Sequence, residues 1–389
     1  MLRTQVGIVG CGPAGLMLSH LLHLAGIESI IIENRSREYC ENRIRAGLIE
    51  QWVIDLLKDT GVGARMQREA MFHSGIHLNF SGALHYLNFK ELVGRSVAIY
   101  GQQEIVKDLI EKRLADGTQI LFEVADTSVH DIDTKAPKIR FKHNGAAQEI
   151  ACDFIGGCDG FHGVCRPAFP DGVLKTYDRE YPFGWLGILS ESPPPDDELI
   201  YSYHDRGFAL YTMRSPVLAR LYFQCAPDED IDNWSDARIW EELHLRIGGV
   251  KPLQEGKILQ KGVTPMRSFV TEPMQYGRLY LAGDSAHIVP PTGAKGMNLA
   301  FADVRMLSRA VAAYYKNGST EKLDGYSQAV LPRIWKGQRF SWWMTSLLHH
   351  FPNENAFDRR RQLAELEYLT SSRAAATTLA ENYTGLPID

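Results

Sequence analysis

Two arginines lie among apolar residues in the segment ALYTMRSPVLARLYF, residues 209–223. The β-branched and aromatic residues around the Ser-Pro pair predict two short strands joined by a turn. A charge in a half-buried sheet is costly without a partner, and this segment contains no acidic residue. Period-two geometry places Thr212 and Arg214 on one face, with Tyr222 on the second strand. A guanidinium, a hydroxyl and a phenol together suit a planar carboxylate.

The segment GCGPAG at residues 10–15 has the glycine spacing of a dinucleotide-binding turn, and it lies between an apolar strand pattern and a helix pattern. Gly10 permits the tight turn, Gly12 lets a pyrophosphate approach the backbone, and Gly15 lets helix and strand pack closely. The helix N-terminus then offers N–H groups to the phosphates. Glu33 ends the next predicted strand, where a carboxylate can bind a ribose hydroxyl.

Two further apolar strand patterns end in an acidic residue beside glycine, DFIGGCDG at 153–160 and LYLAGDSAH at 279–287. The second continues into a loop rich in glycine and proline and then into a helix pattern. This placement could bring Asp284 to a ribityl hydroxyl and present backbone N–H groups to a flavin ring. There is no second GxGxxG motif, so a nicotinamide cofactor would lack a Rossmann domain of its own.

The composition is that of an ordinary globular protein of two or three interleaved units. The chain has 389 residues, 44% of them hydrophobic and 23% charged, and its formal net charge is −5. This charge argues against nucleic acid or an anionic membrane as a partner, and no apolar run is long enough to span a bilayer. The N-terminus shows no signal-peptide pattern, and the six cysteines form neither a CxxC pair nor a zinc-like spacing. We therefore expect a cytoplasmic protein with reduced thiols and no metal site.

The elements that must position these residues follow from periodicity. Residues 4–33 predict a βαβ unit, and residues 176–265 predict a separate sheet built from short aromatic-rich strands. The remaining predicted elements are helices at 47–61, 104–117 and 297–315, strands near 119–124, 138–143, 149–160 and 278–284, and a helical C-terminal third. The segment ESPPPDDE, 191–198, reads as a stiff exposed connector.

The glycine turn and the two acidic segments resemble those of FAD-dependent aromatic hydroxylases, and this resemblance implies an α/β fold in which a Rossmann-like FAD-binding domain is interleaved with a mixed β-sheet substrate domain and followed by a C-terminal helical region. The expected boundaries are FAD binding at 1–175 (with 74–100 contributing to the substrate side), substrate sheet at 176–265, completion of FAD binding at 266–345, and helices at 346–389 that form a candidate subunit interface.

The glycine turn, the DG segment and the GD segment together resemble the single-component FAD-dependent aromatic hydroxylases, and in particular those members that act on 4-hydroxybenzoate. The resemblance covers nearly the whole chain. The stretches that carry it are RIRAGLIEQ (43–51), YGQQE (100–104), GCDGFHGVCR (157–166), YPFGWLG (181–187), PMRSFVTEPM (265–274), LAGDSAHIVPPTGAKGMNLA (281–300), RFSWWMT (339–345) and LAENYTGLP (379–387).

This resemblance implies hydroxylation of 4-hydroxybenzoate to 3,4-dihydroxybenzoate with NAD(P)H and O2, through a flavin hydroperoxide. It assigns the carboxylate of the substrate to Arg214, Thr212 and Tyr222. It implies a proton network of Tyr201, Tyr383 and His73 that deprotonates the phenol, because a phenolate is far more electron-rich at its ortho carbon. Pro291 and Thr292 would present a backbone carbonyl to the reacting edge.

The remaining implied roles concern the cofactors and assembly. Lys295 would add positive potential, and Arg220 would contact the flavin and support its movement. FAD contacts are further implied for Arg45, Gln102, Gly296 and Asn298, and a cleft for the nicotinamide dinucleotide for Tyr39, Arg43, His162, Arg166 and Arg267. The resemblance also implies a homodimer.

Departures from the family leave alternatives open. The carboxylate-site hydroxyl is usually a serine, whereas this chain has Thr212, and Tyr211 beside it is also atypical. These residues leave room for 4-aminobenzoate, 3-hydroxybenzoate or a dihydroxybenzoate as substrate. A non-hydroxylating FAD oxidase or sensor and a plain NAD-dependent dehydrogenase are the rivals from other classes. Arg35 and Arg37 could bind a 2′-phosphate, which favours NADPH over NADH.

Overall fold

A mainly parallel sheet forms the half of the molecule that contains the glycine turn. The computed structural model describes residues 2–247 and 250–388. The strands of this sheet, in spatial order, are β19 (Gln275–Tyr276), β20 (Leu279–Leu281), β13 (Phe154–Gly157), β2 (Val6–Val9), β3 (Ser29–Ile32) and β9 (Gln119–Leu121). All neighbours run parallel except β19 and β20. Apolar strands such as VGIV and SIII suit this position, because a parallel sheet is covered on both faces.

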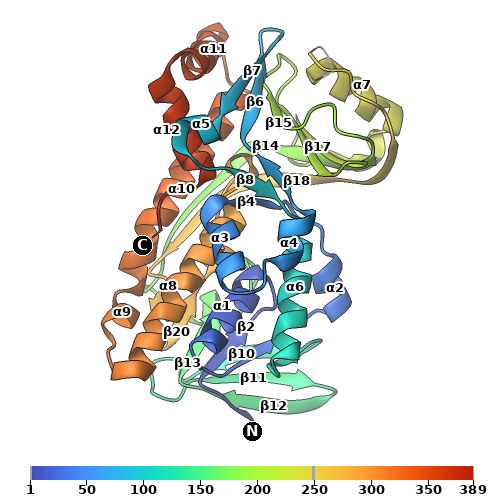
Figure 1. Cartoon of the computed structure of the whole chain (residues 1–389). Helices are drawn as coiled ribbons and strands as arrows, with labels where there is room; N and C mark the ends of the chain where they lie inside the picture. Colours follow the sequence, from blue (N-terminus) through green and yellow to red (C-terminus); the bar gives the residue numbers. More distant parts are fainter. Residues whose placement is uncertain (1, 248–249, 389) are drawn as a thin grey trace.

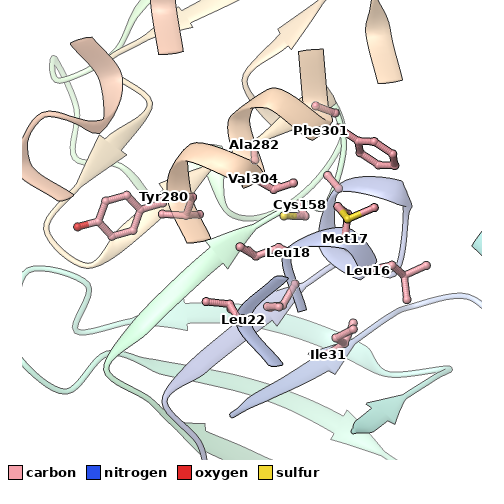
Figure 2. Close-up of a cluster of buried hydrophobic side chains, with 14 of the residues drawn as sticks. Leu16, Met17, Leu18, Leu22, Ile31, Cys158, Tyr280, Ala282, Phe301 and Val304 are labelled. Atoms are coloured by element: carbon pink, nitrogen blue, oxygen red, sulfur yellow. The ribbon is translucent and has the colours of Figure 1, made fainter. Parts of the chain in front are cut away.

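Helices pack on this sheet and close its apolar core. Helix α1 (Pro13–Leu24) leads from β2 to β3 and contacts both α6 (Gln102–Ala115) and α8 (Gly296–Asn317). Figure 2 shows Leu18 of α1 in one cluster with Phe301 and Val304 of α8, and all three side chains are buried. The predicted βαβ unit is therefore confirmed, and the helix predicted over 297–315 is present as α8.

A second, larger sheet occupies the other end of the molecule (Figure 1). Its strands, in spatial order, are β21 (His287–Ile288), β18 (Lys257–Glu272), β14 (Lys175–Glu191), β17 (Leu218–Cys225), β16 (Ala209–Ser215), β15 (Leu199–Ser202), β6 (Gly75–Phe80) and β7 (Ala83–Asn88). Neighbouring strands are antiparallel except β15 and β6. The strand pair predicted around the Ser-Pro turn is present as β16 and β17.

The remaining elements border these two sheets. Short strands form two small sheets: β1 (Leu2–Arg3), β12 (Ala146–Ala151), β11 (Lys138–His143) and β10 (Ala125–His130) in one, and β4 (Leu48–Glu50), β8 (Val97–Ile99) and β5 (Met71–His73) in the other. The other helices are α2 (Arg37–Asn42), α3 (Gln51–Asp59), α4 (Ala64–Glu69), α5 (Phe89–Val93), α7 (Asp236–Arg246), α9 (Glu321–Asp324), α10 (Tyr326–Leu348), α11 (Ala356–Ser371) and α12 (Arg373–Thr384).

The C-terminal helices cover the second sheet. Phe340 and Met344 of α10 and Leu379 of α12 are buried in one apolar cluster with residues of β14 to β17. The long helices α8 and α10 run side by side along one flank of the molecule and connect the two halves (Figure 1).

The mixed α/β class is confirmed, whereas three local predictions were wrong. The first residues of the helix predicted at 47–61 form β4, which pairs with β8. Helix α7 interrupts the region predicted as strands only. The segment at 191–198 was predicted to be exposed, but it buries Ser192 and turns the side chain of Glu198 inward, leaving it 15% exposed.

Candidate active site

The glycine turn between β2 and α1 leaves space on one side only. Gly10 has φ +105°, and a Cβ there would lie 2.3 Å from the carbonyl oxygen of Cys158. A Cβ at Gly15 would lie 2.0 Å from the carbonyl oxygen of Gly10, so this glycine is needed for packing. A Cβ at Gly12 would meet nothing within 4 Å. The open side at the N-terminus of α1 is therefore a cradle suited to a phosphate group.

Glu33 supports this turn from the end of β3. Its Oε2 accepts a hydrogen bond from the backbone N–H of Cys11 at 2.8 Å, and its Oε1 accepts one from Arg35 N–H at 2.9 Å. The carboxylate is thereby fixed beside the glycine turn, the place where the sequence predicts contact with a ribose.

Asp284 follows the end of β20, and its side chain is exposed. The surrounding protein raises the pKa of the Asp284 carboxyl, and the positive charges of His287 and Arg45 lower that pKa in part. A neighbouring cleft of about 580 Å³ is lined by Asn42, Arg43, Ile44, Arg45, Leu189, Leu259 and Gln260. Gln102 and Gly296 begin α6 and α8, and a Cβ at Gly296 would meet open space.

One face of the second sheet brings the candidate substrate residues together. The register places Thr212 of β16 opposite Arg220 of β17, and Leu210 opposite Tyr222. Tyr201 of β15 lies opposite Leu210, so it shares this face. The register therefore places Thr212 and Tyr222 on the same face of the strand pair.

Gly187 of β14 is a member of this face that the sequence analysis missed. It lies opposite Tyr222, and a Cβ there would come within 3.0 Å of Arg220 Nη2 and 3.2 Å of the Tyr222 ring. A larger residue at Gly187 would thus displace both side chains. The only sequence signal was a glycine inside a strand pattern, which indicates a close approach.

Arg214 and Arg220 supply positive charge to this face. Among the described residues, neither guanidinium has a carboxylate within salt-bridge distance, and Arg214 Nε and Arg220 Nη1 are buried without a hydrogen-bond partner. Burial lowers the pKa of Arg214, Tyr222 raises it, and Arg220 lowers it further. Arg220 Nε donates to the Tyr222 hydroxyl at 3.3 Å, and Arg214 Nη2 donates to the carbonyl of Arg45 at 3.4 Å. Two half-buried guanidinium groups without a carboxylate partner favour an anionic ligand.

Tyr201 and Tyr383 form a buried pair of phenols. Their hydroxyl oxygens are 2.6 Å apart, and the Tyr201 hydroxyl also lies 3.5 Å from the carbonyl oxygen of Thr292. Burial raises the pKa of both phenols, so both are protonated at neutral pH. A short phenol–phenol hydrogen bond can pass a proton without either group carrying a lasting charge.

His73 lies at the end of β5 and contacts an acidic residue that the sequence analysis did not assign. Its Nδ1 lies 3.0 Å from Glu198 Oε2, whereas its Nε2 is buried without a partner among the described residues. No direct hydrogen bond joins His73 to Tyr383 within the described part of the chain. The sequence placed Glu198 in a connector, and no local pattern linked it to His73.

A hydrogen bond from α10 holds the loop that contains Pro291 and Thr292. The hydroxyl groups of Thr292 and Thr345 are 2.9 Å apart, and the carbonyl of Thr345 accepts a hydrogen bond from His349 Nδ1 at 3.0 Å. His349 Nε2 in turn accepts from Trp185 Nε1–H at 2.7 Å. This arrangement requires a neutral imidazole, and burial lowers the pKa of His349 to about 3.

Lys295 and Asn298 are held by groups of the protein itself. Lys295 Nζ lies 2.5 Å from Glu50 Oε1 and donates to the carbonyl of Tyr383 at 3.1 Å. Burial lowers the pKa of Lys295, and Glu50 raises it. Glu50 therefore neutralises much of the positive potential expected from Lys295. Asn298 donates to the carbonyls of Leu48 and Ala294 and accepts from Glu50 N–H, so its amide joins α8 to β4.

The residues expected at the nicotinamide cleft fall into two groups. Arg166 and Arg267 each place the guanidinium carbon less than 5 Å from the centroid of the Phe161 ring. His162 contacts the same ring edge-on. Arg267 also binds both carboxylate oxygens of Asp178 at 2.7 Å. Tyr39 on α2 is exposed and lies under Arg35, and Arg43 lines the cleft described above.

Comparison with known proteins agrees with this geometry. A family model described as FAD binding domain matches residues 3–341. The chain therefore belongs to the FAD-binding family of flavoprotein aromatic hydroxylases. It is 48% identical to p-hydroxybenzoate hydroxylase of Acinetobacter baylyi over 391 aligned positions, which cover 100% of this chain and 96% of that protein.

Solved structures show the same fold at lower identity. The p-nitrophenol 4-monooxygenase of Pseudomonas putida DLL-E4 superposes with a TM-score of 0.82 at 17% identity, covering 100% of both chains. The anhydrotetracycline hydroxylase of Streptomyces rimosus gives a TM-score of 0.78 at 20% identity, covering 100% of this chain and 77% of that one. The predicted Rossmann-like FAD fold is thereby confirmed.

None of the helices in 2–247 and 250–388 has the length and apolar content needed to cross a bilayer. The same residues contain no group of three or more His, Cys, Asp or Glu side chains placed to bind a metal ion.

Proposed function

We propose that this flavoprotein monooxygenase converts 4-hydroxybenzoate, NAD(P)H and O2 into 3,4-dihydroxybenzoate, NAD(P)+ and water. The observation that carries the substrate assignment is the position of Arg214 relative to Tyr201 on one sheet. Tyr201 lies opposite Leu210, and Arg214 is four residues further along β16, at the register shift between Met213 and Ser215. A substrate with a carboxylate and a phenol in para positions would place the carboxylate at Arg214 and the phenol at Tyr201.

The residues around the glycine turn fit FAD. The pyrophosphate would lie on the open side of Gly12, the ribose at Glu33, which is fixed beside the turn, and a ribityl hydroxyl at the exposed Asp284. Arg45, Gln102, Arg220, Lys295, Gly296 and Asn298 complete the proposed set from the loops and helix starts described above. When bound and reduced by NAD(P)H, FAD supplies the activated oxygen.

The chain itself orients and activates the aromatic ring. Arg214 binds the carboxylate with help from Tyr222, and Tyr201 accepts the proton of the substrate phenol while passing its own proton to Tyr383. The resulting phenolate is more reactive at its ortho carbon, which Pro291 and Thr292 position. His73 receives the proton beyond Tyr383.

The nicotinamide dinucleotide is proposed to bind at Tyr39, Arg43, His162, Arg166 and Arg267. NADPH is the favoured form: Arg37 is paired with Glu41, whereas Arg35 lies over Tyr39 with its charge available for a 2′-phosphate. We also propose a cytoplasmic homodimer. Exposed Trp342 of α10 and Phe357 of α11 support a subunit contact, because large exposed apolar side chains are typical of interfaces.

The test is NAD(P)H oxidation by the purified FAD-loaded protein with a panel of substituted benzoates and product identification. We expect 4-hydroxybenzoate to stimulate oxidation most strongly and to yield 3,4-dihydroxybenzoate. Stronger coupled turnover of 4-aminobenzoate, 3-hydroxybenzoate or a dihydroxybenzoate would instead assign that substrate. Hydrogen peroxide as the product with every ligand would indicate an oxidase or sensor.

A further inference from the structure

The side chain of Glu198 connects three segments of the substrate half. Its Oε1 accepts hydrogen bonds from the Ser74 backbone N–H at 3.0 Å and from the Tyr86 hydroxyl at 3.1 Å, and its Oε2 lies 3.0 Å from His73 Nδ1. The His73 side chain is 1% exposed and that of Glu198 is 15% exposed. One carboxylate oxygen is thus anchored by two donors, while the other is left for the imidazole.

This geometry fixes the tautomer of His73. A carboxylate oxygen can only accept, so Nδ1 of the neutral ring carries the proton and donates it to Glu198. Nε2 is then the basic nitrogen, and this atom is buried and free of any partner among the described residues. Glu198 therefore keeps Nε2 of His73 available to accept a proton.

We propose that Glu198 is the outlet of the proton network, a positioning residue that holds His73 in its proton-accepting tautomer and passes the proton to solvent. The inference rests on the proposed hydroxylase function. The proton released by the substrate phenol arrives at His73 Nε2, the Nδ1 proton moves to Glu198 Oε2, and the partly exposed carboxylate releases it to water. No charge remains in the site beyond the phenolate itself.

The charged and titratable groups around this pair are consistent with that role. Tyr86 faces Glu198 from β7, and burial, with the nearby charge of Glu198 adding to it, raises the pKa of Tyr86 to about 12. Tyr383 faces it from α12, and the negative charge of Glu198 is one cause of the raised pKa of that phenol. Asp196 lies beyond it, where it pairs with His77 at 3.4 Å and Lys251 at 2.9 Å.

The replacement Glu198→Gln tests the proposal because the backbone around it dictates how the new amide group is oriented. The Ser74 N–H can only donate, so the amide oxygen must occupy the Oε1 position, where the Tyr86 hydroxyl can still donate to it. The amide NH2 then faces His73 and forces Nδ1 to accept, which moves the ring proton to Nε2. This change reverses the tautomer while the shape of the side chain is kept.

The experiment uses the FAD-loaded protein with bound 4-hydroxybenzoate and follows phenolate formation by ultraviolet absorbance after a rapid rise in pH. We expect Glu198→Gln to slow this step at least about tenfold, since positioned acid–base groups typically contribute factors of about 10²–10⁴. The dissociation constant of 4-hydroxybenzoate and the flavin spectrum should stay unchanged. Tyr86→Phe removes one donor to Oε1 but leaves the contact between Glu198 and His73 in place. In this variant the bound substrate should ionise at the wild-type rate. Glu198→Asp should restore part of the lost rate.

A second measurement does not depend on the substrate. Nitrogen-15 NMR of labelled histidine should report an Nδ1–H tautomer for His73 in the unaltered chain and an Nε2–H tautomer in Glu198→Gln. Unchanged ionisation kinetics, or an unchanged tautomer, in that variant would overturn the role of Glu198. If 4-hydroxybenzoate fails to bind the unaltered chain, the proposed substrate is wrong, and the NMR result still decides the contact between Glu198 and His73.

Discussion

The hydroxyl of Thr212 donates its hydrogen bond to the carbonyl oxygen of Arg220, 2.8 Å away on the neighbouring strand. A hydroxyl has a single proton, so this contact occupies the donor that the sequence analysis assigned to the substrate carboxylate. Arg214 is consequently the main donor to that carboxylate. The threonine methyl distinguishes this chain from the usual serine. Thr212 is only 6% exposed, so this methyl is buried.

Thr212→Val should affect stability more than substrate binding. The replacement keeps the shape and removes the bond to Arg220, so we expect the free energy of unfolding to fall by about 1 kcal/mol. The dissociation constant of 4-hydroxybenzoate should change less than about threefold. Urea denaturation and a flavin-fluorescence titration measure the two quantities, and Thr212→Ser, which keeps the hydroxyl, serves as the matched control. A large loss of affinity in the valine variant alone would show that the hydroxyl turns to the substrate.

Arg214→Met should weaken binding of 4-hydroxybenzoate at least about tenfold, because a charge-assisted hydrogen bond is worth roughly 1.5–3 kcal/mol. The same titration with 4-hydroxybenzamide, which lacks the negative charge, should show a much smaller change. Equal losses for both ligands would mean that Arg214 supports the fold rather than the carboxylate.

Tyr383→Phe should leave substrate binding intact and lower the rate of hydroxylation. The variant removes the acceptor 2.6 Å from the Tyr201 hydroxyl, so the phenol of the substrate loses its route for deprotonation. We expect product formation to fall by about 10² or more, with NADPH oxidation diverted to hydrogen peroxide. Product and peroxide are quantified together; normal coupling in this variant would contradict the proposed relay.

Gly12→Ala and Gly15→Ala should separate cofactor binding from folding. Alanine at Gly12 meets open space in the protein, so the apoprotein should keep its melting temperature while its affinity for FAD falls. Alanine at Gly15 would contact the backbone of Gly10 at 2.0 Å, so that apoprotein should be destabilised. Thermal denaturation of both apoproteins with a FAD titration tests the pair, and tight FAD binding by Gly12→Ala would argue against the cradle.

His349 should make stability depend on pH. Burial lowers its pKa in the folded state from 6.5 to about 3, so between these values the unfolded chain binds a proton that the folded chain excludes. Stability supplied by the neutral ring is therefore present above pH 6.5 and is lost as pH falls, by about 1.4 kcal/mol per pH unit. The difference in unfolding free energy between the unaltered chain and His349→Gln should shrink with that slope between pH 6 and 4.5. A constant difference would contradict this assignment.

Local sequence patterns predicted the elements that carry the site. They did not predict the side-chain pairs that are far apart in the sequence. The glycine turn and the strand pair of Arg214 and Tyr222 follow from spacing and period two, which depend on neighbouring residues. Glu198 and His73 are separated by 125 positions, and Lys295 and Glu50 by 245. Each of these pairings results from the packing of separate elements, so one sequence gave no signal that the charge of Lys295 would be neutralised.

The order of strands in the parallel sheet has a consequence for biosynthesis. β2 pairs with β3 on one side and with β13, residues Phe154–Gly157, on the other. One edge of β2 therefore stays unpaired while roughly 150 further residues are synthesised, which takes about 8–30 s at ribosomal rates of about 5–20 residues per second. An apolar strand edge left open for that time is prone to intermolecular pairing. We expect nascent chains released before β13 to aggregate, and the yield of folded protein to depend on chaperones that shield this edge during translation.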